Sequence, residues 1–112
     1  PRRSIYGDGS QVRDYLYIDD AVEAYLLALE KPFDGPVNFG TGNTISIMEL
    51  ARRIFSLVEG RLEGTSAWEF GHPRRGEVQH LQCDASKAHS LGWSPKILFD
   101  EGLKRYVTWA TT

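Results

Sequence analysis

The chain has 112 residues, of which 41% are hydrophobic and 25% charged, the balance of one soluble globular domain rather than a disordered or fibrous segment. Thirteen basic and fifteen acidic side chains leave a net charge of −2, which argues against a nucleic acid partner. The longest apolar runs, such as Ala24 to Leu29, fall far short of the roughly 20 residues that span a bilayer, so we expect no membrane segment.

Cysteine content and the first residues bear on compartment and processing. The single cysteine, Cys83, excludes an internal disulfide and fits a reducing compartment, so we expect a cytoplasmic protein. Pro1-Arg2-Arg3 carries no initiator Met and no apolar run follows it, so we expect neither a signal peptide nor a natural start here, and a longer parent chain is an open alternative.

The first predicted elements are a strand and a helix. A turn rich in glycine at 7–10 precedes β-branched and aromatic residues from Val12 to Ile18, which predict a strand. Asp19 or Asp20 is the expected N-cap of the helix that follows, which ends before Lys31-Pro32. Its apolar positions recur at helical spacing: Val22, Tyr25, Leu26 and Leu29.

A short strand and a second helix come next. Pro36 to Gly40 predicts a brief strand that enters a tight turn. Ser46 and Glu49 have the spacing of a capping box, and Glu49 and Arg53 form a favourable i,i+4 pair. One apolar stripe runs along this helix as far as Gly60: Ile47, Leu50, Ala51, Ile54 and Val58.

The second half of the chain predicts extended segments followed by helices. Gly60 to Thr65 is an expected loop, Ser66 to Phe70 a strand, and Gln79 to Cys83 a further extended stretch. Asp84 is an expected cap of a short helix that runs through Leu91.

The last predicted element is a C-terminal helix. Asp100 is its expected cap, and Phe99 can staple its start against an apolar residue one or two turns later. The element order predicts an α/β or α+β fold with three to four short strands and about four helices. No linker long enough to divide the chain is present, so we expect residues 1–112 to form a single domain.

Two motifs invite cofactor or metal interpretations. Gly40-Thr41-Gly42 before a helix is similar to a dinucleotide-binding turn, but Ile45 stands where that motif has its last glycine, which favours a simple tight turn. Residues with metal-ligating side chains gather in one stretch: His72, His80, Cys83, Asp84 and His89. On a strand, His80 and Cys83 would face opposite sides, which argues against a metal site.

No catalytic group is predicted. The sequence holds no Gly-x-Ser-x-Gly elbow and no cysteine with an obviously paired histidine, and no tyrosine has a lysine four residues later. The neighbours Asp19 and Asp20 are a possible carboxylate pair, but a position at a helix start favours capping.

Arginines beside small residues are more informative. Arg13 follows the first glycine turn, and Arg74-Arg75 precedes Gly76-Glu77. Guanidinium groups beside small residues can bind phosphate, and the carboxylate of Glu77 can accept hydrogen bonds from sugar hydroxyls. Together these residues indicate a nucleoside diphosphate site. The alternative is that each arginine forms an ordinary surface ion pair.

A long motif near the N-terminus resembles a known family. The stretch Ile5-Tyr6-Gly7-Asp8-Gly9-Ser10-Gln11-Val12-Arg13-Asp14-Tyr15-Leu16-Tyr17-Ile18-Asp19-Asp20 resembles the NAD-dependent epimerase/dehydratase family, the extended short-chain dehydrogenases that act on nucleotide sugars. Further matches follow in order: Asn38-Phe39-Gly40-Thr41-Gly42, the helix Ser46–Ile54, Arg74-Arg75-Gly76-Glu77-Val78, Asp84-Ala85-Ser86-Lys87-Ala88, Leu91-Gly92-Trp93-Ser94-Pro95 and Glu101-Gly102-Leu103. The resemblance covers nearly the whole chain but only the last third of the family's usual length.

The resemblance implies that this chain corresponds to the part of a family enzyme that binds the nucleotide sugar, without the part that holds the catalytic residues. Neither the family's glycine-rich NAD loop nor its Tyr-x-x-x-Lys pair has a counterpart here, so NAD is expected only in a complete enzyme and the chain alone is not expected to be competent. At matching positions, Arg13 and Arg74 would hold the diphosphate and Glu77 would accept ribose hydroxyls. Ser4 and Tyr6 would line the base. The family often has Arg-Pro-Gly where this chain has Arg74-Arg75-Gly76, which leaves open which arginine faces phosphate.

The resemblance also implies an incomplete packing surface. In the family, the first helix and the strand at 38–40 pack on the large sheet of the NAD domain, so we expect a partner chain or self-association to cover Val22, Leu26, Leu29 and Phe39. A separate NAD-binding domain is one such partner. The alternative function is a stand-alone interaction or oligomerisation module derived from the family, in which Tyr15, Tyr17 and Trp68 would serve packing or partner contact.

Overall fold

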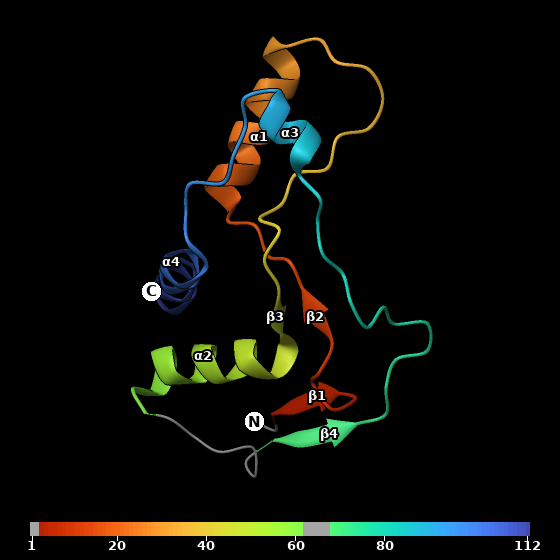
Figure 1. The fold of residues 1–112 in the computed structure, drawn as a ribbon. Coiled ribbons are helices and arrows are strands. Elements are labelled where there is room, and N and C mark those ends of the chain that lie inside the picture. The colour runs from red at the N-terminus through yellow and green to blue at the C-terminus, as the bar shows by residue number, and fades with distance from the viewer. Residues whose placement is uncertain (1–2, 62–67) are drawn as a thin grey trace.

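The computed structural model describes residues 3–61 and 68–112. The described part is mixed α/β, with four helices and four short strands, as the sequence predicted. In chain order the elements are β1 (Ser4–Tyr6), β2 (Val12–Arg13), α1 (Ile18–Glu30), β3 (Ile45–Ser46), α2 (Ile47–Glu59), β4 (Glu69–Gly71), α3 (Ser86–Ser90) and α4 (Phe99–Thr111) (Figure 1).

Within the described residues, the strands pair in two separate sheets of two strands. β1 and β4 are parallel, with Tyr6 opposite Gly71. β2 and β3 are antiparallel, with Val12 opposite Ser46. Val12 also forms a bridge to His80, so the predicted extended stretch at 79–83 contributes a single bridge rather than a strand. These pairings bring residues around 6, 12, 71 and 80 into one region of the molecule.

Two predicted strands are shorter than expected or missing. The strand predicted over Val12 to Ile18 ends at Arg13, because the next residue, Asp14, turns to bind another segment and α1 already begins at Ile18. Pro36 to Gly40 forms no strand, since no described segment pairs with its backbone in a ladder. Part of the predicted loop and strand, residues 62–67, lies outside the described residues.

α1 packs on α3 and on the segment that follows it. The indole of Trp93 donates a hydrogen bond to the Asp20 carbonyl (3.1 Å), and the Phe39 ring meets Trp93 edge-on at 5.1 Å. The Asp20 side chain, 3% exposed, accepts the backbone N–H groups of Lys96 and Ile97 at 3.0 Å each. The expectation that Asp19 or Asp20 caps this helix was therefore wrong, because the buried carboxylate of Asp20 anchors a distant loop instead.

α2 begins as its sequence predicts. The Ser46 hydroxyl accepts the backbone N–H of Glu49 (3.1 Å), and Arg53 Nε donates to Glu49 Oε1 (3.0 Å). Arg53 also reaches Asp100 Oδ1 at 2.5 Å and so ties α2 to α4. Asp100 lies inside the first turn of α4 and does not cap it, contrary to the expectation.

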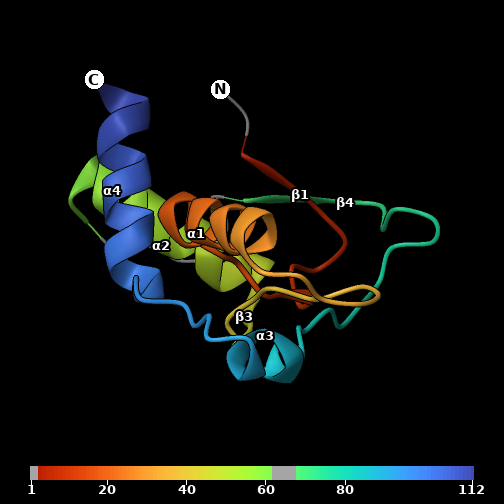
Figure 2. The same ribbon diagram turned by 90° about the horizontal axis from the view of Figure 1, so that it is seen from above.

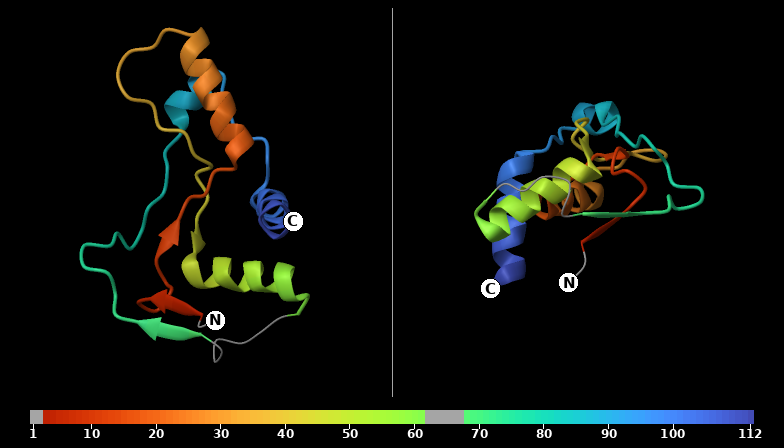
Figure 3. Two further views of the ribbon diagram at one scale, coloured as in Figure 1. Left: turned by 180° about the vertical axis from the view of Figure 1, so that it is seen from behind. Right: turned by 90° about the horizontal axis from the view of Figure 1, so that it is seen from below.

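The described chain is flat and open. Its principal extents are 50 × 35 × 18 Å and its radius of gyration is 16.5 Å, against about 13 Å for a compact domain of this size. The α1/α3 pair and the β1/β4 pair lie at opposite ends, and α4 is seen end-on between them (Figures 1 and 3). The view from above places α4 along one side of the molecule, away from β1 and β4 (Figure 2).

This open shape leaves a small core and an uncovered helix face. The buried hydrophobic cluster consists of Ala24, Ala85, Ala88 and Trp93. One face of α1 exposes apolar side chains, which we call the α1 stripe: Ile18, Val22, Tyr25, Leu26 and Leu29. Val22, Leu26 and Leu29, which were expected to need a covering partner, are exposed. Phe39, the fourth residue of that set, packs against Trp93 within the chain.

Candidate functional site

A cleft opens where the ends of β1 and β4 meet the loop that follows β4. Its volume is about 680 Å³, within the range of small-molecule sites. We call it the Tyr6 cleft. It is lined by Tyr6, Gly7, Asp8, Ser10, Gln11, Phe70, Gly71, Pro73, Arg74, Glu77 and Gln79.

The loop after β4 presents its charged side chains from a tight turn. The N–H of Glu77 donates to the carbonyl of Arg74 at 3.2 Å, and Gly76 has the positive φ of 77° that the third residue of a type II turn requires. Arg75 is the second residue of this turn, a position that favours proline. Arg74 lines the cleft, whereas Arg75 is not among the lining residues.

Three of the five predicted site residues share this cleft. The Arg74 guanidinium lies 4.2 Å from the centre of the Tyr6 ring, in the geometry of a cation–π contact. Glu77 Oε1 lies 3.4 Å from Arg13 Nη2, so Arg13 reaches the cleft through Glu77 although the lining does not include it. Ser4 is two residues from Tyr6 at the far end of β1 and also lies outside the described lining.

The turn between β1 and β2 adds a fixed negative charge to the rim. Asp8 Oδ1 accepts hydrogen bonds from the hydroxyl of Ser10 (2.6 Å) and from its backbone N–H (2.9 Å). These bonds lower the pKa of the exposed Asp8 carboxyl. Gln79 in turn donates to the Ser10 hydroxyl at 2.9 Å, which joins the turn to the opposite wall of the cleft.

The glycine turn that follows Gly40 is organised by a carboxylate. Asp14 accepts hydrogen bonds from the backbone and hydroxyl of Thr41, from the N–H of Gly42 (2.7 Å) and from the N–H of Cys83 (3.3 Å). Burial alone would raise the pKa of Asp14, but these bonds outweigh it and the pKa is lowered. A pyrophosphate held by this turn would need the same N–H groups and would face a carboxylate, so the turn does not fit NAD.

The residues considered as metal ligands do not converge. Among residues 3–61 and 68–112, no group of three or more His, Cys, Asp or Glu side chains is placed to hold a metal ion. His80 Nε2 lies 3.0 Å from Gln82 Oε1, and Cys83 is a free cysteine packed against Gly40. Burial, together with the charges of Asp14 and Asp84, raises the pKa of the Cys83 thiol.

Among the described residues, no helix is both long and apolar enough to cross a bilayer.

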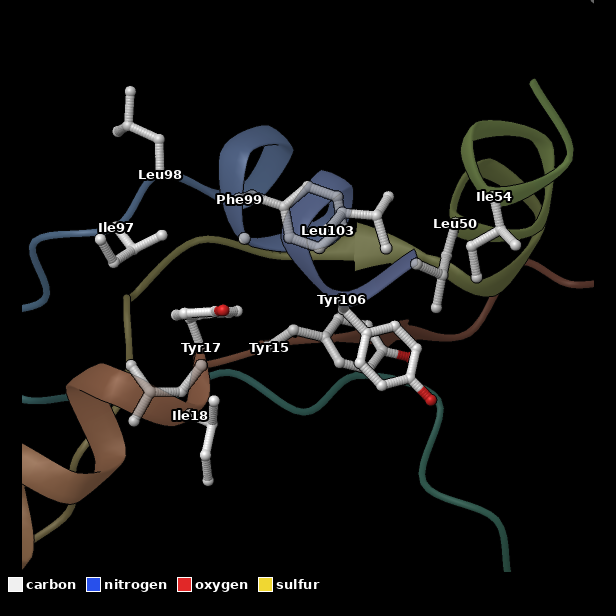
Figure 4. Close-up of a pocket in the computed structure, with 12 residues that line it drawn as sticks. Tyr15, Tyr17, Ile18, Leu50, Ile54, Ile97, Leu98, Phe99, Leu103 and Tyr106 are labelled. Atoms are coloured by element: carbon white, nitrogen blue, oxygen red, sulfur yellow. The ribbon is translucent and has the colours of Figure 1, made fainter. Parts of the chain in front are cut away.

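A second hollow lies between α2, α4 and the start of α1 (Figure 4). It encloses about 400 Å³ and is walled by aromatic and aliphatic side chains, with Leu50 and Ile54 on α2 and Leu103 and Tyr106 on α4. Ile18, the first residue of the α1 stripe, also lines it, so this apolar cavity continues onto the exposed face of α1. Its described lining holds none of the cationic side chains that a diphosphate needs.

Sequence reasoning assigned no role to two polar residues that organise the site. Gln11 is 6% exposed, and its amide donates to the Tyr6 carbonyl (3.0 Å) and to Glu77 Oε1 (3.4 Å). Asp14 accepts hydrogen bonds from the glycine turn that follows Gly40, which we call the Thr41 turn. Apart from the Tyr6 carbonyl, five positions from Gln11, the partners of these two residues lie 27 or more positions away. Neither the periodicity nor the spacing of the sequence therefore indicates these contacts.

Comparison with known proteins gives consistent matches over nearly the whole chain. Residues 2–106 match the family described as GDP-mannose 4,6 dehydratase. A putative UDP-glucose 4-epimerase of Methanocaldococcus jannaschii is 40% identical over 94% of this chain, and a dTDP-D-glucose 4,6-dehydratase of Mus musculus is 37% identical over 94%. The structure of the UDP-glucose 4-epimerase of Thermotoga maritima with UDP-glucose covers 98% of the chain, with a TM-score of 0.88 and 37% identity.

The matched proteins are much longer than this chain. It spans 33% of the Methanocaldococcus protein, 31% of the mouse protein and 35% of the Thermotoga chain. The similarity is thus to about a third of each relative.

Proposed function

The chain belongs to the family of NAD-dependent epimerases and dehydratases of nucleotide sugars, and we propose that its Tyr6 cleft binds the nucleoside diphosphate part of such a substrate. One observation carries the proposal: an aromatic ring, a guanidinium and a carboxylate, those of Tyr6, Arg74 and Glu77, share one cleft.

Each of these groups suits one part of a nucleoside diphosphate. A guanidinium forms paired, charge-assisted hydrogen bonds with phosphate oxygens, the role we give to Arg74 and Arg13. The carboxylate of Glu77 accepts ribose hydroxyl protons. We place the nucleobase beside the ring and backbone of Tyr6, extending towards the backbone of Ser4, which lies outside the cleft lining. When the diphosphate enters, Arg74 would leave the Tyr6 ring for the phosphate.

The chain's share of the reaction is binding and orientation. Precise placement of a substrate strongly raises the rate of its reaction. In a complete enzyme, NAD would supply the transient oxidation of the sugar. The sequence holds neither the Tyr-x-x-x-Lys pair nor the glycine-rich NAD loop of the family, and the Thr41 turn has its N–H groups bonded to Asp14. We therefore assign to this chain no catalytic residue and no bound cofactor.

Calorimetric titration with UDP, dTDP and GDP tests the proposal. Wild-type chain is expected to saturate with at least one of them, and Arg13→Ala or Arg74→Ala is expected to weaken that binding about tenfold or more, because each removes charged hydrogen bonds. Arg75→Ala is the matched control and should stay within about twofold, since Arg75 lies at the tip of the turn outside the lining. Lack of saturation at millimolar concentrations of all three nucleotides would contradict the proposal.

A second candidate function is an interaction module. The observation in its favour is the α1 stripe, in which Ile18 is 64% and Leu29 84% exposed. Exposed apolar surface of this kind marks contact sites, and a separately encoded NAD-binding domain or a second copy of the chain would suit it. This candidate does not exclude nucleotide binding, because the α1 stripe and the Tyr6 cleft share no residue.

A further inference from the structure

Gln11 is a buried polar residue fixed between the two walls of the Tyr6 cleft. Its side chain is almost fully enclosed, with 6% of the residue exposed. Its backbone carbonyl accepts the N–H of Ile47 at 3.0 Å, which holds it against the start of α2. The amide therefore projects from a fixed point.

The amide of Gln11 holds one oxygen of a proposed ligand-binding carboxylate. Gln11 Nε2 donates to Glu77 Oε1 at 3.4 Å and to the Tyr6 carbonyl at 3.0 Å. Arg13 Nη2 approaches the same Oε1 at 3.4 Å. Within the described part of the chain, both hydrogen bonds to the Glu77 side chain are to this one oxygen. Glu77 Oε2 is thus left for a ligand.

Two contacts bear on how Glu77 and Arg13 meet: the Gln11 amide on Glu77 Oε1, and the Val12 carbonyl, which accepts Arg13 Nη1 at 2.8 Å. A carboxylate and a guanidinium prefer a bidentate pair, in which both oxygens and two N–H groups are used. Such a pair would take Oε2 of Glu77 from the sugar hydroxyls and would turn Arg13 away from phosphate. With the amide on Oε1, the ion pair is instead a single contact of 3.4 Å, at the outer edge of a hydrogen bond.

We propose that Gln11 is a positioning residue, whose amide keeps Glu77 Oε2 available to the sugar and Arg13 available to the diphosphate. The inference rests on the proposed function and deepens it. Gln11 need not touch the ligand, since it acts through Glu77.

A double-mutant cycle separates this role from a merely structural one. Gln11→Met keeps the length and burial of the side chain but removes the donor, and Glu77→Ala removes the group through which Gln11 acts. Affinity is measured by calorimetry for UDP, dTDP or GDP, whichever the wild-type chain binds most tightly. Gln82→Met is the matched control, because Gln82 bonds to the Gly42 carbonyl outside the Tyr6 cleft.

We expect Gln11→Met to weaken binding about two- to tenfold in the wild-type background, the range of one hydrogen bond, and less than about twofold in the Glu77→Ala background. Gln82→Met should change affinity by less than about twofold. Equal losses from Gln11→Met in both backgrounds, or no loss in the wild type, would overturn the positioning role while leaving nucleotide binding intact.

A failure of the proposed function is distinguishable from a failure of the positioning role. If the wild-type chain binds none of the three nucleotides, the proposed function fails and the role of Gln11 with it. Thermal melts establish that each variant is folded, and Gln11→Leu, an apolar side chain one carbon shorter, repeats the cycle if the Met variant unfolds.

Discussion

Asp14 lies where three segments far apart in the sequence meet. Its two carboxylate oxygens accept hydrogen bonds from Thr41, Gly42 and Cys83, and it directly follows Arg13. Because backbone N–H groups that are buried without a partner destabilise a fold, this one side chain stabilises both the turn after Gly40 and the start of the segment leading to α3. It also fixes the backbone from which Arg13 extends.

We expect Asp14→Asn to lower the free energy of unfolding by about 1–3 kcal/mol at pH 7, because the new amide would face N–H donors. The pKa of Asp14 is lowered in the folded state from its ordinary value of 3.8, so its contribution is complete above that value and is lost as the pH falls through the lower folded pKa. The difference between wild type and variant should therefore shrink between pH 6 and pH 3.

Urea unfolding at the two pH values measures this difference. Exposed carboxyls such as Asp8 and Asp84, whose pKa values are also lowered, titrate alike in both proteins and cancel in the comparison. A difference that stays constant or grows on acidification would contradict the role given to Asp14.

At the same scale, the residues of the site were only partly foreseeable. Arg74 and Glu77 stand three positions apart around a glycine, a spacing typical of a turn, so their shared location was predictable from the sequence. Gln11 and Asp14 escaped notice because their partners come from β1, the Thr41 turn and the loop after β4. Contacts across such distances depend on the fold and leave no periodic pattern.

Among the elements, the turn at Gly40 has the tightest packing requirement. A Cβ added to Gly40 would lie 2.7 Å from Cys83 Sγ, closer than a Cβ approaches a neighbouring atom, and it would also crowd the Asp14 carboxylate. We expect Gly40→Ala to destabilise the chain by about 1–3 kcal/mol, the usual effect of overpacking. Thermal unfolding would show this as a melting temperature lower by roughly 4–8 °C per kcal/mol.

Gly71→Ala is the matched control for this substitution. Gly71 has an ordinary φ, and an added Cβ would meet the Ile5 carbonyl and the Tyr6 ring only at van der Waals distance, 3.8 and 4.0 Å. Its melting temperature should stay close to that of the wild type. Equal shifts for both variants would show that the Gly40 contact is not the cause.

Helices were predicted better than strands, for a physical reason. The limits and the Ser46 cap of α2 follow from residues within a few positions, and all four helices exist. A strand needs a backbone partner, and Pro36 to Gly40 pairs with no described segment, so its β-like composition does not produce a strand. The caps expected from Asp20 and Asp100 failed because each carboxylate bonds to another segment instead.

For the molecule as a whole, the flat shape and the α1 stripe have the same explanation. A chain with a radius of gyration well above that of a compact domain cannot bury all its apolar side chains within itself. The uncovered residues gather on one face of α1 and continue through Ile18 into the apolar cavity of Figure 4. We infer that this continuous surface is covered by another protein or by a second copy.

We expect the chain to self-associate at high micromolar concentration in sedimentation experiments when no other partner is present. Val22→Glu combined with Leu29→Glu should shift it towards the monomer, because both side chains belong to the α1 stripe. Val58→Glu, on the exposed side of α2, serves as the control. A wild-type chain that is monomeric throughout this range would contradict self-association.

The central claim, that the Tyr6 cleft binds a nucleoside diphosphate, is tested most directly by backbone amide chemical shifts of the ¹⁵N-labelled chain. UDP, dTDP and GDP are added in turn up to millimolar concentration. We expect saturable shifts gathered at Tyr6, Ser10, Glu77 and Gln79, with the amides of Leu50 and Leu103 in the apolar cavity unchanged. Shifts centred on the apolar cavity, or none with any of the three nucleotides, would contradict the claim.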